Sequence, residues 1–275
     1  MAPKVGVLLV HGMGDQSPNF GSDFIDDIER RLRKLRVPSG DVVWDRGYWA
    51  GVLNHAQATL WEQMRRENDL DWVGVRKFFL YSFADAVAYR RNEGTPLGTY
   101  SAIHRAIREG LEALSVRAGR DDIPLIVLAH SLGSTIMSDC IWNHQRSNGL
   151  AVGRTPLERM ETLCGLVTFG STIPLFSLAL PSVQAIDFPA PGLPENLRNA
   201  AKWTNYYDPD DVLGWPLLPL GAAYQRVVDA DVAIDVGGLL NSWNPTSHGR
   251  YWDDDDFAGP VSRFIRDVVL ATARP

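Results

Sequence analysis

Residues 126–134 read Ile126-Val127-Leu128-Ala129-His130-Ser131-Leu132-Gly133-Ser134. The apolar run at the start of this stretch is typical of a buried β-strand, and a helical pattern follows Ser131. Small residues lie two positions before and two positions after the serine, as a tight turn between a strand and a helix requires. The stretch therefore predicts a strand, a sharp turn with Ser131 at its corner, and a helix, which is a unit of α/β architecture.

Apolar runs elsewhere in the chain predict the other strands of a sheet. The expected strands are 5–10, 41–48, 125–129, 163–169, 203–207 and 227–236. Helical spacing marks 22–35 (with Ser22 as N-cap), most of 52–118 with a break at 95–98, 132–146 and 256–273. Because strands alternate with helices, we expect a three-layer α/β fold with a mainly parallel sheet of about six strands. The whole chain, 1–275, is expected to form one domain, with a cap or lid-like insertion at 173–194.

Composition and charge exclude several classes of protein. The chain has a net charge of −6, whereas a nucleic-acid-binding protein usually has a basic surface. Cys140 and Cys164 each lie in an apolar segment, which predicts buried free thiols in a reducing compartment. The apolar run near the N-terminus is shorter than the core of a signal peptide, and no run is long enough to cross a bilayer. We therefore expect a cytoplasmic protein without stable membrane insertion.

Ser131 is a candidate nucleophile, and such a serine needs partners. A base must take the hydroxyl proton, a carboxylate must orient that base, and backbone N–H groups must stabilise the oxyanion. This strand–turn–helix corner resembles the one that presents the serine in α/β-hydrolases, where the order along the chain is serine, acid, histidine. Of the six histidines, only His248 follows the sixth predicted strand, so it is the candidate base.

The other histidines have expected roles in packing. His11 directly follows the first strand, where it is expected to anchor its loop with hydrogen bonds. His130 adjoins the nucleophile and should point away from its hydroxyl oxygen. His55, His104 and His144 lie in helical patterns and are expected on the surface or in helix packing.

The candidate acid follows the fifth strand, in a turn that contains Asp208, Asp210 and Asp211. We favour Asp211 because it directly precedes an apolar pair. Asp208, which an Asp-Pro step places first in the turn, is the alternative. The aspartates that do not act on the histidine are expected to cap the turn.

Two backbone amides are candidates for the oxyanion hole. His11-Gly12-Met13-Gly14 follows the first strand, and its glycines allow the backbone to direct an N–H group toward a substrate. We assign one donor to Met13 and the second to Leu132, the residue after the nucleophile. The four acids 253–256 precede a helix and are expected to cap it, with calcium binding as the weaker alternative.

Several of these segments resemble those of known enzymes. Residues 207–217 resemble the acid segment of lipase-like α/β-hydrolases, including the DDHD-domain phospholipases, and 247–252 resemble the S-H-x-x-Y-W histidine loop of those enzymes and of related bacterial hydrolases. Residues 9–14 and 129–133 are similar to the general signatures of hydrolases. The resemblance implies an α/β-hydrolase fold with Ser131, Asp211 and His248 as the catalytic residues. The chain lacks the aspartate and histidine metal cluster after which the DDHD family is named.

The expected activity is cleavage of carboxylic esters, as in an esterase or lipase, through an acyl-enzyme on Ser131. No metal or organic cofactor is expected. Apolar segments at 173–188 and 213–224 flank the predicted site and suit a hydrophobic ester or lipid, although they could also be packed loops without a substrate role. The same residues would serve an amidase, peptidase or thioesterase, and a non-catalytic binding protein with a hydrolase fold is the remaining alternative. The sequence predicts no particular oligomeric state.

Overall fold

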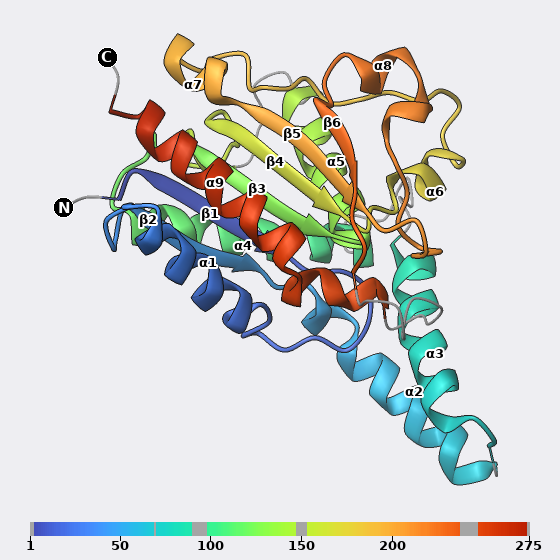
Figure 1. Cartoon of the computed structure of the whole chain (residues 1–275). Helices are drawn as coiled ribbons and strands as arrows, with labels where there is room; N and C mark the ends of the chain where they lie inside the picture. The colour runs from blue at the N-terminus through green and yellow to red at the C-terminus, as the bar shows by residue number, and fades with distance from the viewer. Residues whose placement is uncertain (1–2, 69, 90–97, 147–152, 237–246, 274–275) are drawn as a thin grey trace.

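The computed structural model describes residues 3–68, 70–89, 98–146, 153–236 and 247–273. Its sheet contains β1 (Val5–Val10), β2 (Val42–Gly47), β3 (Leu125–His130), β4 (Leu163–Phe169), β5 (Lys202–Tyr207) and β6 (Ala230–Ala233). The strand order is β2-β1-β3-β4-β5-β6, and every neighbouring pair is parallel (Figure 1). The predicted α/β class with a six-stranded parallel sheet is confirmed.

Helices alternate with the strands along the chain, as the sequence predicts. They are α1 (Ser22–Lys34), α2 (Asn54–Glu67), α3 (Val73–Ala88), α4 (Thr99–Ala118), α5 (Leu132–Arg146), α6 (Ile173–Ser177), α7 (Glu195–Ala200), α8 (Ala222–Gln225) and α9 (Asp255–Ala271). The described residues also contain three 3₁₀ turns, each before a helix: η1 (Ala50–Val52), η2 (Leu218–Leu220) and η3 (Ser247–Asp253). Helices α1 and α9 cover one face of the sheet and α4 and α5 the other, which makes three layers (Figure 1).

Two predicted features differ from the structure. The sixth strand has four residues rather than ten, because the amides of Val227 and Val228 close a helical turn on the Tyr224 carbonyl. Ser22 is the first residue of α1 and not its N-cap, since its hydroxyl donates to the Asn19 carbonyl oxygen. The cap position is Gly21, whose φ of 69° lies in the left-handed region that favours glycine.

Other local predictions agree with the structure. The carboxylate of Asp254 accepts the amides of Asp256 and Phe257, so the acidic run caps α9. Cys140 and Cys164 are buried free thiols. Most of the predicted break at 95–98 lies outside the described residues, and the segment expected as a cap begins with α6.

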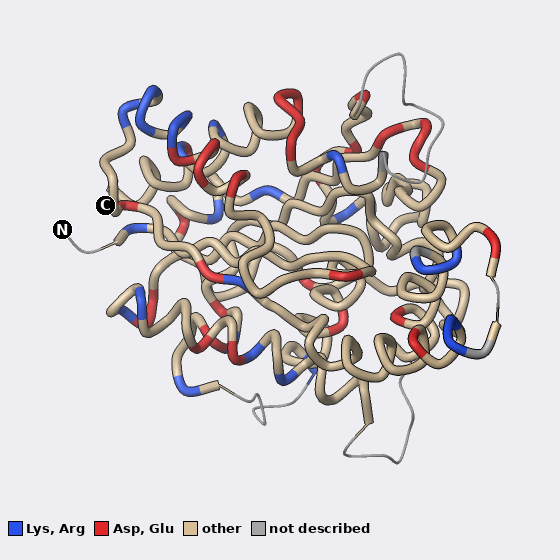
Figure 2. The backbone as a smooth tube through the Cα atoms, turned by 90° about the horizontal axis from the view of Figure 1, so that it is seen from below, with Lys and Arg blue, Asp and Glu red and all other residues tan. Residues whose placement is uncertain are grey.

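The three central strands β1, β3 and β4 are buried along their whole length. This is the pattern of a parallel sheet covered on both faces, and it makes the carboxyl ends of these strands a rigid platform. Basic and acidic residues are mixed along the outer elements (Figure 2).

Helices α2 and α3 form a hairpin, residues 54–88, that projects from the body of the molecule (Figure 1). It lies beside the end of the sheet toward which the strands point. Within the described ranges, the helices lack the length and apolar character needed to cross a membrane.

Candidate active site

Ser131 occupies the turn between β3 and α5, and its backbone is held in an unusual conformation. Its φ of 53° lies in the left-handed region, which L-residues other than glycine rarely adopt. The Ser131 amide donates to the Phe169 carbonyl oxygen at 3.0 Å, and the Ser134 hydroxyl donates to the Ser131 carbonyl oxygen at 2.6 Å. These bonds hold the strained turn and place the serine at the carboxyl end of the central strands.

Glycines let the backbone of β1 and its following loop approach this turn closely. A Cβ at Gly133 would lie 2.5 Å from the His11 carbonyl oxygen, and a Cβ at Gly12 would lie 2.4 Å from the Cβ of Ser131. Both contacts are shorter than real Cβ contacts allow, so larger residues would push the loop and the turn apart. The glycine two positions after the serine is therefore required by packing between two strand ends.

His248 joins Ser131 to Asp211 through two short hydrogen bonds. Its Nε2 lies 2.6 Å from the Ser131 hydroxyl oxygen, and its Nδ1 lies 2.7 Å from Oδ2 of Asp211. An ionised carboxylate only accepts hydrogen bonds, so Nδ1 carries the proton and Nε2 accepts from the hydroxyl. The structure thus brings together the three side chains that the sequence predicted, from the turn after β3, the turn after β5 and η3.

Asp211, and not Asp208, is the carboxylate that contacts the histidine. Burial alone would raise the pKa of Asp211, but the hydrogen bonds and charge of His248, with help from the Leu213 amide and Tyr251, lower that pKa below its ordinary value. Asp208 instead accepts the amides of Asp210 and Val236 at 2.8 and 3.0 Å. It organises the turn, as the sequence predicted for an aspartate that does not act on the histidine.

Tyr251 is a site residue to which the sequence analysis assigned no role. Its buried hydroxyl donates to Oδ2 of Asp211 and accepts the amide of Asp208, both at 2.9 Å. Burial raises the pKa of this phenol far above its usual range, so it remains a donor to the carboxylate. Its position in the motif Ser247-His248-Gly249-Arg250-Tyr251-Trp252 was the available signal.

His130 contacts the backbone of the loop that carries His248. Its Nε2 donates to the backbone carbonyl oxygen of His248 at 2.7 Å, so the ring is engaged with the loop and not with the serine hydroxyl. Burial, with the charge of His248 as the next cause, lowers the pKa of His130 to about 3. The ring is therefore neutral at physiological pH and adds no positive charge beside His248.

His11 anchors the loop that follows β1, as the sequence predicts. Its Nε2 accepts the amides of Trp49 and Ala50 at 3.1 and 3.2 Å, so the proton lies on Nδ1, which donates to the Gly12 carbonyl oxygen. Burial lowers the pKa of His11 to about 4, which keeps this arrangement neutral. The ring also stacks on the Trp49 indole.

The other end of this loop is held by the α2–α3 hairpin. The Gly14 amide donates to Oδ2 of Asp85 at 2.9 Å, and the Gln57 side chain donates to Oδ1 at 2.7 Å. Burial raises the pKa of Asp85 to about 6, although both hydrogen bonds oppose this shift. Sequence reasoning missed Asp85 and Gln57, because each lies in an ordinary helical pattern without a local motif.

Met13 and Leu132, the predicted oxyanion donors, lie on the two backbones that meet at Gly12 and Ser131. Leu132 is the first residue of α5, where an amide has no acceptor within its helix. In the part of the chain that the structure describes, neither amide has a hydrogen-bond acceptor. Both residues therefore stay candidates for the oxyanion hole, and the N-terminus of α5 favours negative charge near Ser131.

The remaining histidines do not join this group. His55 is exposed on α2, and His144 is half-buried on α5. His104 is a buried residue of α4. Its Nε2 lies 2.9 Å from the Tyr89 hydroxyl oxygen, and its Nδ1 lies 3.3 Å from Sγ of Cys140.

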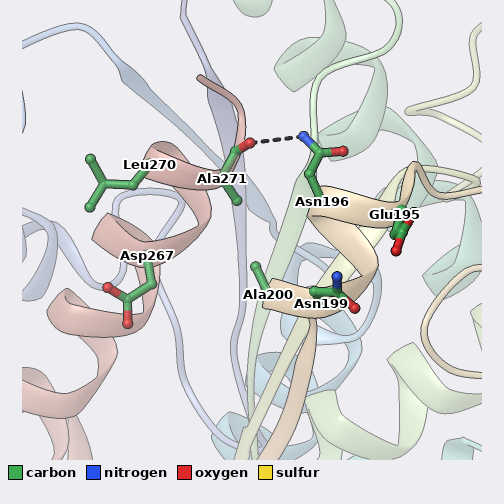
Figure 3. Close-up of a pocket in the computed structure, with 7 residues that line it drawn as sticks. All are labelled: Glu195, Asn196, Asn199, Ala200, Asp267, Leu270 and Ala271. Atoms are coloured by element: carbon green, nitrogen blue, oxygen red, sulfur yellow. Dashed lines mark hydrogen bonds between the residues drawn. The ribbon is translucent and has the colours of Figure 1, made fainter. Parts of the chain in front are cut away.

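A surface pocket between α7 and α9 lies at the opposite edge of the sheet, where the strands begin (Figures 1 and 3). The Asn196 side chain donates to the Ala271 carbonyl oxygen across it, and Glu195 and Asp267 add carboxylates. Its lining contains no serine, cysteine or histidine among the described residues. The pocket therefore takes no part in the site at Ser131.

Among the residues with described positions, no three or more His, Cys, Asp or Glu side chains are grouped as a metal ion would need. In the acidic run that calcium could have used, Asp254 caps α9 and Asp255 pairs with Arg31.

No model of a protein family matches this chain, and a comparison with curated proteins found no match either. The sequence and structure establish an α/β fold with a parallel sheet and a buried Ser131–His248–Asp211 hydrogen-bond series. The geometry of that series is the basis for assigning a function.

Proposed function

We propose that this protein is a serine hydrolase of the α/β-hydrolase type that cleaves carboxylic esters. The observation that carries the proposal is the series of hydrogen bonds from Asp211 through His248 to Ser131, at 2.7 and 2.6 Å. A carboxylate, an imidazole and a hydroxyl in this order form the arrangement that activates serine nucleophiles on several unrelated folds. The strained strand–turn–helix corner under Ser131 adds a second feature of such sites.

In the proposed reaction, the Ser131 hydroxyl oxygen attacks the carbonyl carbon of the ester. Its proton passes to Nε2 of His248, and the negative charge of Asp211 stabilises the resulting imidazolium. The carbonyl oxygen becomes an oxyanion that accepts hydrogen bonds from the Met13 and Leu132 amides. When the tetrahedral intermediate collapses, the alcohol leaves with the proton from His248, and the acyl group remains on Ser131.

Water then completes the cycle. His248, neutral again, accepts a proton from a water molecule that attacks the acyl carbon. A second tetrahedral intermediate forms, the acid is released, and the proton returns to the Ser131 oxygen. No step requires a metal or an organic cofactor.

The surroundings favour a substrate with an apolar part. Exposed apolar side chains follow Asp211 and the α6 turn, on the two segments that lead away from the site. They are Val212, Trp215, Leu175, Leu178, Leu180 and Val183. The Trp215 amide donates to the Ser171 carbonyl oxygen at 3.0 Å, which joins the two segments beside the acid. A hydrophobic acyl chain or alcohol would contact these side chains.

The proposal is tested by labelling and turnover. A fluorophosphonate probe should label wild-type protein at Ser131, as located by peptide mass spectrometry, and Ser131→Ala should abolish both labelling and turnover of p-nitrophenyl esters. Ser182→Ala, at an exposed serine of the segment after α6, is the matched control. A series of acyl-chain lengths, with a peptide amide and a thioester beside it, separates the classes of substrate. Absence of labelling and of turnover on all of them would indicate a non-catalytic binding protein.

A further inference from the structure

Exposed apolar side chains gather at one end of this molecule. Among the described residues, sixteen large apolar side chains are exposed, and eight of these lie on the α2–α3 hairpin. Six more lie on the segments beside the site, and only Val116 and Leu270 lie elsewhere. Scattered exposed apolar residues are ordinary on a protein surface, but a concentration of this kind marks an interaction site.

On the hairpin, α3 carries a stripe of such residues along one side. Val75, Phe79, Phe83 and Val87 recur every four residues and are all exposed, and the rings of Phe79 and Phe83 stack at 5.5 Å. Residues at this spacing share one helix face. On the other side, the C-terminal half of α3 is buried at Tyr81, Ser82 and Asp85, and Asp85 holds the Gly14 amide. Helix α3 therefore presents apolar side chains to solvent as well as to the body.

The tip of the hairpin continues this stripe. Trp72, in the turn between the helices, is 77% exposed and has a φ of 59°, a strained conformation for a bulky residue. Leu60 and Met64 of α2 are exposed as well. We call these two residues, Trp72 and the four-residue stripe of α3 the hairpin surface.

The charge around the tip differs from that of the whole chain. Residues 65–77 contain four cations (Arg65, Arg66, Arg76 and Lys77) against three acids, whereas the chain carries a net charge of −6. A negatively charged surface would therefore be repelled less at the tip than the net charge of the whole chain implies. Exposed aromatic and aliphatic side chains with Lys and Arg nearby can insert into the headgroup region of a membrane.

The hairpin surface adjoins the proposed site. At the base of the hairpin, Asp85 contacts the loop that carries Met13, and the Tyr89 ring lies 6.2 Å from the ring of Phe176 on α6. Figure 1 shows the hairpin and α6 on the same end of the molecule, beside the carboxyl ends of the strands. The apolar side chains of both regions thus lie at the end of the molecule that carries Ser131 and its partners.

We propose that the hairpin surface docks on a lipid–water interface, and that the ester substrate reaches Ser131 from that lipid layer. This inference rests on the proposed function. A folded partner seated on both apolar regions would keep an ester from this end of the molecule, whereas a lipid layer covers the same side chains and supplies the substrate. The described helices are unsuited to crossing a bilayer, so the hairpin would lie in the interface with its stripe toward the acyl chains.

The test uses phosphatidylcholine vesicles, with and without phosphatidylglycerol, and the double variant Phe79→Ser/Phe83→Ser. Wild type should sediment with the vesicles, more strongly with the anionic lipid, and the variant should bind on the order of tenfold more weakly. The ratio of turnover on a long-chain ester in vesicles to turnover on dissolved p-nitrophenyl acetate should fall in parallel. Val116→Ser, which alters an even more exposed apolar residue on α4, should behave as wild type.

Two results would overturn the proposal. One is absence of wild-type binding to either vesicle, or equal binding by wild type and the double variant. The other is a wild-type dimer in sedimentation velocity that the double variant converts to monomer, without vesicle binding, because the surface would then join two copies. Since binding is measured without turnover, failure on dissolved esters would contradict the proposed function and leave the docking result interpretable.

Discussion

The backbone N–H of Gly14 donates a hydrogen bond of 2.9 Å to the carboxylate of Asp85, and this bond joins the loop after β1 to the base of the α2–α3 hairpin. His11 fixes the same loop on its other side through the amides of Trp49 and Ala50. Met13, the candidate oxyanion donor, therefore lies between two anchored positions. An amide held in this way needs little reorganisation when charge develops on a substrate oxygen.

Replacing Asp85 should affect turnover through this loop. Asp85→Ala removes the acceptor of the Gly14 amide, and we expect kcat on a dissolved ester to fall about tenfold or more with a smaller change in KM. Asp85→Asn should retain most of kcat, because its amide oxygen can accept from Gly14 while Gln57 turns its own oxygen toward the new NH₂ group. An Asp85→Ala enzyme with wild-type kcat would contradict a positioning role for Asp85.

The pKa of Asp85 predicts a pH dependence of stability. Burial raises this pKa from 3.8 to about 6, so the folded state favours the neutral carboxyl group. The resulting stabilisation is complete below about pH 4 and is lost as the pH rises through about 6. Asp85→Asn remains neutral throughout, so its stability relative to wild type should increase between pH 4 and pH 7 by up to about 3 kcal/mol.

Urea unfolding of both proteins at the two pH values measures this difference. Exposed Asp235→Asn serves as the control and should show little change relative to wild type. If the difference in unfolding free energy between Asp85→Asn and wild type is the same at both pH values, Asp85 does not titrate in this range.

Asparagine substitutions of Asp208 and Asp211, in the turn after β5, should have different effects on turnover and stability. Asp211→Asn disturbs the tautomer and charge of His248, and we expect kcat to fall about 10³- to 10⁴-fold. Asp208→Asn places an NH₂ group near the amides of Asp210 and Val236, so it should cost about 1–2 kcal/mol of unfolding free energy with much less loss of kcat. Esterase kinetics and urea unfolding of the two variants provide the comparison. The reverse order of kcat values would assign the acid role to Asp208.

Close packing under the nucleophile makes Gly12 intolerant of a side chain. A Cβ there would lie 2.4 Å from the Cβ of Ser131, so Gly12→Ala should shift the serine turn, reduce kcat by at least about tenfold and cost about 1–3 kcal/mol of stability. A methyl group at Gly249, beside His248, would meet nothing within 4 Å apart from its chain neighbours, so Gly249→Ala is the matched control. Equal kcat for the two alanine variants would argue against close packing as the constraint.

The sequence by itself determined most of the elements and the position of the candidate nucleophile. Continuous apolar runs and helical spacing depend on short stretches of chain, so five strands were predicted to within about two residues, and Ser131 was recognised from its immediate neighbours. His248 followed from chain order alone. Asp211 was favoured but not separated from Asp208, because both lie in one short turn.

Only the tertiary structure decided which distant groups meet. Asp211 faces His248 because the β5 turn and η3 converge at the carboxyl end of the sheet, and Tyr251 joins both aspartates of that turn. Asp85 reaches Gly14 across 71 positions, which no local pattern records. The exposed stripe of α3 could not be predicted for the same reason. Helix α3 carries apolar residues on more than one side, and only packing shows which side contacts the body and which is exposed to solvent.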